Sequence, residues 1–123
     1  MNNNKISFID YPSVILLESL YQDSKVILVT DIVYIEAFRN KCVVHMNDGK
    51  THEFGNTMKS IEKDLDPAVF VKIHRSFIIN IKYLDSCCYG YVTMKNHQEL
   101  PIGDNCRKVL QKYFCVWGPR KRR

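Results

Sequence analysis

The stretch 70–84, FVKIHRSFIINIKYL, contains the densest group of side chains that could bind a ligand. It carries three basic residues and one histidine, and no carboxylate follows until Asp85. Apolar residues flank its polar centre, which consists of His74, Arg75 and Ser76. A guanidinium is costly to bury without a partner, so we expect Arg75 at the surface. The pattern predicts a strand that reaches the surface at these three residues and then returns to the core.

Two further segments offer similar groups, and both are predicted to lie in loops or at the ends of elements. The first comprises Arg39, Asn40 and Lys41, and the second opens the last predicted helix with Asn105, Arg107 and Lys108. Arginine suits the O6 and N7 atoms of guanine, and asparagine suits the N6 and N7 atoms of adenine. The three segments therefore indicate nucleic-acid binding, and the competing interpretation is ordinary solvated surface charge.

The net charge of the chain is concentrated at its C-terminal end. The formal charge is +5, and Arg120, Lys121, Arg122 and Arg123 supply four of these charges, which leaves +1 for residues 1–119. The predicted folded body is thus nearly neutral. Any contact with a polyanion must come from a local patch and not from a global field.

The cysteines and the glycines argue against a metal site and an enzyme. The five cysteines form no CxxC pair and have no zinc-like spacing to the four histidines. No motif places a base beside a nucleophile or a glycine-rich loop under a phosphate. We therefore expect no enzyme, no metal and no cofactor.

The cysteine count and the N-terminus bear on location. An odd cysteine count without a signal peptide favours free thiols and a cytoplasmic location. The apolar run 14–17 is too short to span a membrane.

Hydrophobic periodicity and turn signals predict a mainly β chain with two helices. We expect strands over 13–20, 25–29, 33–38, 42–46, 50–54, 83–89, 91–95 and 97–101, in addition to those of the stretch 70–84. Asp48 and Gly49 favour a hairpin turn. One helix should begin at residues 56–57 and end near Pro67, and a second should begin at residues 103–104.

Four of these segments together resemble the LytTR family of bacterial DNA-binding domains. They are IVYIEA at 32–37, the DG turn at 48–49, FVKIHRSFIIN at 70–80 and LPI at 100–102. The resemblance implies an elongated antiparallel β fold of LytTR type with one mid-chain and one C-terminal helix. It makes residues 14–114 the domain, 1–13 an N-terminal extension and 115–123 a basic C-terminal tail. It also implies that loops, and not a recognition helix, enter successive major grooves.

Family contacts transfer only where the residues match. The resemblance maps the central DNA contact of the family to Arg75, in the triplet of His74, Arg75 and Ser76. It implies that Ser76, next to Arg75, contacts a phosphate. The loop contact maps to Arg39, Asn40 and Lys41. Relatives often carry a basic residue just past the LPI strand, where this chain has Asp104. We therefore assign the third contact to Asn105 and Lys108.

The expected function is that of a bacterial transcriptional regulator that binds specific double-stranded DNA. Since one small domain reads few bases, we expect two copies, as a homodimer, on repeated half-sites. Many relatives carry a receiver domain before this domain, so we expect this chain to be either a stand-alone regulator without one or an excised fragment. We expect no membrane partner. The alternative is a LytTR-fold module that has lost specific DNA binding and binds a protein or a small ligand. Asp104 and the nearly neutral body favour this alternative.

Overall fold

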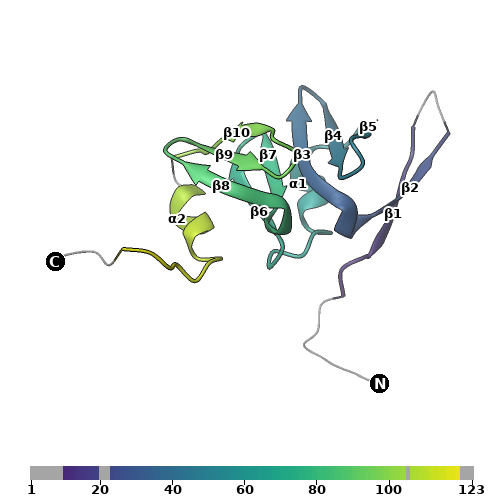
Figure 1. Cartoon of the computed structure of the whole chain (residues 1–123). Coiled ribbons are helices and arrows are strands. Elements are labelled where there is room, and N and C mark those ends of the chain that lie inside the picture. Colours follow the sequence, from purple (N-terminus) through teal and green to yellow (C-terminus); the bar gives the residue numbers. More distant parts are fainter. Residues whose placement is uncertain (1–9, 20–22, 105, 120–123) are drawn as a thin grey trace, which may run out of the picture.

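The computed structural model of the chain describes residues 10–19, 23–104 and 106–119, and its centre is a five-stranded antiparallel sheet. The strand order is β5-β4-β3-β7-β6. The sheet comprises β3 (Ile32–Phe38), β4 (Lys41–Met46), β5 (Thr51–Phe54), β6 (Phe70–His74) and β7 (Phe77–Asn80). The strands β3, β4, β6 and β7 are joined in pairs by short turns, so the turns after β3 and β6 become candidate tips of the sheet (Figure 1).

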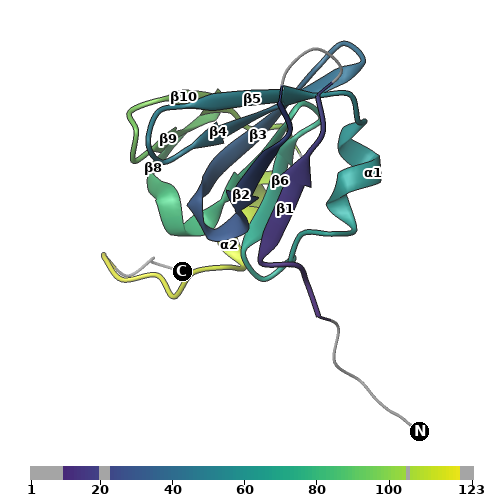
Figure 2. The ribbon, with the colours of Figure 1, turned by 90° about the vertical axis from the view of Figure 1, so that its right-hand side faces the viewer.

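Two smaller antiparallel units and two short helices complete the fold. The strands β8 (Leu84–Cys88), β9 (Tyr91–Met94) and β10 (Glu99–Pro101) form one sheet, and β1 (Val14–Leu17) pairs with β2 (Lys25–Leu28) as a hairpin. The helices are α1 (Met58–Glu62) and α2 (Cys106–Gln111), and the 3-10 turns are η2 (Val29–Asp31) and η3 (Ile81–Tyr83). Figure 2 shows the β1–β2 hairpin in front of one face of the central sheet, with α1 beside it. The predicted mainly β, antiparallel fold with a mid-chain and a C-terminal helix is confirmed.

Several predicted elements are longer than the observed ones. The first strand covers Val14–Leu17 and not 13–20, and the last strand begins at Glu99 and not at residue 97. The second shortening has a clear cause, because His97 has a φ of 73° and its N–H donates to the Met94 carbonyl in a turn. The last helix begins at Cys106, whose N–H donates to the Gly103 carbonyl at 3.0 Å.

The central sheet is buried on both faces, so the first four residues of β3, residues 32–35, are all apolar and buried. One face, with Ile32 and Ile35 of β3, packs in a cluster with the β1–β2 hairpin and α1. The other face, with Val33 and Tyr34, packs in a second cluster with β9, β10 and α2. None of the helices in the described residues has the length and apolar character needed to cross a bilayer.

Asn80 is the one buried polar side chain among the described core residues. Its Nδ2 donates to the Ile32 carbonyl at 2.9 Å, and its Oδ1 accepts from the Lys82 N–H at 3.0 Å. The amide therefore holds the turn after β7 and also ties that turn to the start of β3. A buried amide with both ends satisfied stabilises one register of the sheet.

The buried phenol of Tyr34 generates a prediction about alkaline stability. Tyr34 is 4% exposed and stacks on His45 with the ring centroids 4.0 Å apart. Burial first, and then the Glu36 carboxylate, raises its pKa from 10 to about 12. Because the folded pKa lies above the unfolded one, this stabilisation is present below pH 10 and is lost as the pH rises through 12. By linkage, the loss between pH 9 and pH 11 is about 1.4 kcal/mol.

The measurement is the free energy of unfolding in denaturant at pH 9 and pH 11. Tyr34→Phe should lose about 1 kcal/mol less than the unaltered protein over this interval, because it has no phenol to ionise. Tyr89→Phe is the matched control, since Tyr89 is 91% exposed. An equal loss in the Tyr34→Phe variant and the unaltered protein would contradict the assignment.

Candidate nucleic-acid interface

The turn between β6 and β7 presents the central basic residue. Arg75 and Ser76 connect the two strands, and the register shifts between Lys72 and His74. His74 Nδ1 accepts from the Ser76 N–H at 3.0 Å, and the rings of His74 and Phe77 lie 5.7 Å apart. His74 thus fixes the turn as an acceptor for the backbone. In the neutral form the proton is then on Nε2, which is left as a donor.

Arg75 itself is exposed. Its guanidinium forms no salt bridge, hydrogen bond or ring contact with the described residues. A short turn on a rigid sheet therefore carries five N–H donors without an acceptor from the described part of the chain. This is the arrangement that the sequence predicted for the residue.

The turn between β3 and β4 presents two further polar side chains. Arg39 and Asn40 connect the strands, and both are exposed. Arg39 has a φ of 61°, a left-handed conformation that few L residues adopt, and its guanidinium carbon lies 5.5 Å from the centre of the Phe38 ring. The first segment is therefore a tight tip with a cation held above an aromatic ring.

Lys41 differs from its two neighbours because it is already paired. Its Nζ lies 2.7 Å from Glu53 Oε1 on the neighbouring strand β5, and 5.8 Å from the centre of the Phe38 ring. The side chains of Lys41 and Glu53 are 37% and 60% exposed. A phosphate would have to compete with Glu53 for this ammonium group, whereas Arg39 has no carboxylate partner among the described residues.

The third segment joins β10 to α2. Asp104 and Lys108 are exposed, and Asn105 lies outside the described residues. Arg107 is half-buried, donates from Nη1 to the Cys88 carbonyl at 3.2 Å, and has its guanidinium carbon 5.2 Å from the centre of the Tyr89 ring. Lys108 is thus the cation of this segment that extends into solvent without a partner among the described residues.

Backbone hydrogen bonds bring the three segments to one end of the central sheet. The Ala37 N–H, next to the β3–β4 turn, donates to Ser76 in the β6–β7 turn at 2.8 Å. The Gly103 N–H, just before α2, donates to Ile73 at the end of β6 at 2.7 Å. The tips therefore follow one another as β3–β4, β6–β7 and β10–α2, with the Arg75 tip in the middle. We call this end of the sheet the three-tip edge.

The sequence interpretation missed one element of the three-tip edge. The Ile102 N–H donates to Gly90 at 3.0 Å, which places the β8–β9 turn beside the third tip. Tyr89 in this turn is 91% exposed and lies under the guanidinium of Arg107. The available signal was Tyr89 itself, directly before Gly90, because an aromatic side chain in a turn is seldom needed for packing.

Several other polar residues have structural roles. Glu36 Oε1 lies 3.1 Å from His45 Nε2 on the neighbouring strand, so this carboxylate ties β3 to β4. Burial raises the pKa of the Cys42 thiol, which lowers its reactivity at neutral pH. Among the described residues, no three His, Cys, Asp or Glu side chains are grouped so that they could hold a metal ion.

Comparison with known proteins agrees with this geometry. The model of the LytTr DNA-binding domain matches residues 22–114. A solved structure, the LytTr DNA-binding domain of a protein described as a methyl-accepting/DNA response regulator from Bacillus cereus, superimposes with a TM-score of 0.71 at 20% sequence identity. The match covers 83% of this chain and 96% of that chain. No curated protein matches. The family match spans most of the chain, so the protein belongs to the LytTr DNA-binding domain family, a family of DNA-binding domains and not of enzymes.

Proposed function

We propose that this protein is a transcriptional regulator that reads specific double-stranded DNA with the three-tip edge. The observation that carries the proposal is the exposed, unpartnered guanidinium of Arg75 between two other polar tips. A protein reads sequence with a few donors that reach base edges, and it fixes its register with phosphate contacts. One arginine on a rigid turn, flanked by polar tips, supplies both kinds of contact.

The tips differ in the contacts that they can make. Arg75 is suited to the O6 and N7 atoms of a guanine in the major groove, and the adjacent Ser76 to a phosphate. Arg39 and Asn40 would contact the next part of the duplex on one side. Lys108, together with Asn105, would contact it on the other side. His74 supports the central turn and offers Nε2 as a further donor.

Asp104 is the residue least suited to this function. Its carboxylate is exposed at the third tip and would repel a phosphate, although it can accept from the N4 amino group of cytosine. The nearby Arg107 is held by the Cys88 carbonyl and Tyr89, and it is not paired with Asp104 in a salt bridge. The third tip should therefore contribute less affinity than the first two, and more of the recognition should fall on Arg75 and Arg39.

Two copies of the domain would bind repeated half-sites as a homodimer, because one edge of this size reads few base pairs. The protein would act in the cytoplasm. The body is nearly neutral, so non-specific affinity should be low and binding should depend on the local edge. Random-site selection of a duplex, followed by the mass of the complex in solution, would establish both the half-site and the number of copies.

The first prediction of this proposal concerns Arg75. Arg75→Ala should weaken binding to the selected duplex by about 1–3 kcal/mol and relax discrimination at one base step, because a bidentate base contact is lost. Lys59→Ala, which removes an equal charge from exposed α1, is the matched control and should leave discrimination unchanged. Fluorescence anisotropy with matched and single-mismatch duplexes measures both effects. If the two variants lose the same affinity on every duplex, Arg75 contributes only charge and the assignment fails.

The second prediction separates the two cations of the first tip. Arg39→Ala should weaken DNA binding more than Lys41→Ala, because the Lys41 ammonium group is already paired with Glu53 at 2.7 Å. Conversely, Glu53→Gln should release Lys41 for a phosphate. The slope of log affinity against log salt should then steepen by about 0.9, the value for one phosphate contact. Equal effects of the two alanine variants, together with an unchanged slope for Glu53→Gln, would show that Glu53 does not restrain Lys41.

A further inference from the structure

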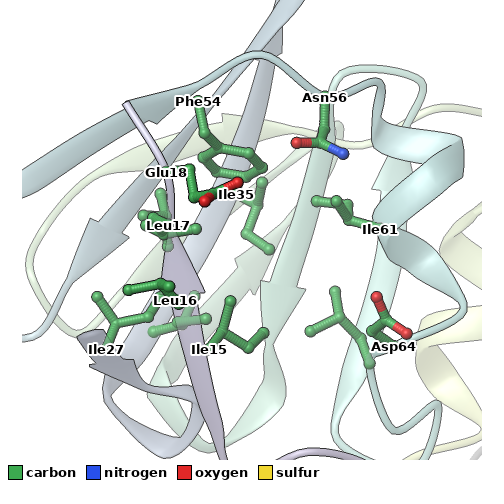
Figure 3. Close-up of a pocket in the computed structure, with 13 residues that line it drawn as sticks. Ile15, Leu16, Leu17, Glu18, Ile27, Ile35, Phe54, Asn56, Ile61 and Asp64 are labelled. Atoms are coloured by element: carbon green, nitrogen blue, oxygen red, sulfur yellow. The ribbon is translucent and has the colours of Figure 1, made fainter. Parts of the chain in front are cut away.

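A cavity of about 230 Å³ lies away from the three-tip edge, between the β1–β2 hairpin, the central sheet and α1 (Figure 3). Well-packed domains leave few voids larger than a water molecule. An apolar cavity of about 150 Å³ can already hold benzene, so this one has room for a small organic molecule. The fold therefore provides a pocket that the proposed DNA contacts do not use.

The walls of the cavity are mostly aliphatic. Ile15 and Ile27 come from the hairpin, Ile35 from β3 and Ile61 from α1, and Phe54 closes one side. Figure 3 shows these side chains directed into a common space. Such a lining favours a ligand with an apolar body, because burial of apolar surface is the main favourable term in a site of this kind.

The charged residues of the cavity are both carboxylates. Glu18 lies on the wall formed by the hairpin, and Asp64 lies just after α1 on another wall (Figure 3). Neither carboxylate has a salt-bridge partner among the described residues, and the thirteen residues that line the cavity include no lysine, arginine or histidine. Asn56 adds one amide. A cation at the opening would gain from both carboxylates, whereas an anion would be repelled by both.

From these observations we infer that the cavity is a binding site for a small molecule with an apolar body and a protonated amine. The apolar body would lie among the isoleucines, and the ammonium group would face one of the two carboxylates, Glu18 or Asp64. A carboxylate ligand of the same size is disfavoured by the two acidic residues, and a neutral one gains nothing from them.

The segment that closes the cavity is not part of the family match. Residues 15–18 supply four of the lining residues, whereas the family model begins at residue 22. The part of the wall formed by β1 therefore lies outside the family match, whereas Ile27 of β2 lies inside it. A ligand that contacts Ile15 on one side and Ile35 on the other would hold the hairpin against the sheet, so binding should also raise the melting temperature.

The test uses the full chain without DNA, so that its failure would leave the DNA-binding proposal intact. The probes are hexylammonium, 1-hexanol and hexanoate, which share one chain and differ in charge. Isoleucine methyl groups labelled with ¹³C report the location by NMR. Ile15, Ile27, Ile35 and Ile61 line the cavity, and Ile73, Ile79 and Ile102 belong to the other core cluster and serve as internal controls.

Hexylammonium should shift the cavity isoleucines saturably and leave the control isoleucines in place, and it should bind at least about fivefold more tightly than hexanoate. The double variant Glu18→Gln, Asp64→Asn should lower hexylammonium affinity about fivefold without changing hexanol affinity. Asp85→Asn, an exposed carboxylate on β8, is the matched control and should change neither. The inference is overturned if hexylammonium gives no saturable shift, if hexanoate binds as tightly, or if the double variant binds hexylammonium unchanged.

Discussion

The three-tip edge depends on two backbone hydrogen bonds, one from Ala37 to Ser76 and one from Gly103 to Ile73. They join segments that lie far apart in the sequence and hold them around the end of β6. Side chains in tight turns lose less freedom on binding when the backbone beneath them is already fixed. The edge therefore needs little rearrangement to meet a duplex, and small changes in the register of β3 or β6 would misplace all three tips together.

Pairing within the chain decides which cations remain for a ligand. Lys41 is held by Glu53, and Arg107 is held by the Cys88 carbonyl and the Tyr89 ring, whereas Arg75 has no partner among the described residues. Exposed salt bridges are worth little for stability, so the Lys41 pair is better understood as a restraint on where positive charge is offered. A nearly neutral body with an unpaired arginine at its edge is the charge distribution that the proposed sequence-specific DNA binding requires.

The fold and the central tip could be predicted from the sequence because local patterns determine them. The apolar flanks of residues 74–76 required a turn at the surface, and turn chemistry predicted the hairpin at Asp48 and Gly49. The pairing state of each cation could not be predicted, because Lys41 and Glu53 meet only through the β4–β5 register. The position of Tyr89 beside the third tip, and the cavity under the β1–β2 hairpin, depend on how separate sheets pack, which no local pattern encodes. The bounds of the N-terminal extension and the basic tail stay predictions, since residues 1–9 and 120–123 lie outside the described residues.

The cavity and the three-tip edge are separate parts of the molecule. DNA bound at the edge should therefore leave the residues of the cavity unchanged. The most direct test of the central claim is a map of backbone amide shifts by NMR as the selected duplex is titrated into the full chain. The account predicts that the largest shifts fall together at residues 39–40, 75–76 and 106–108, with little change around Ile15 and Ile61. Large shifts on the outer face of the β1–β2 hairpin or on α1, with residues 75–76 unaffected, would contradict it.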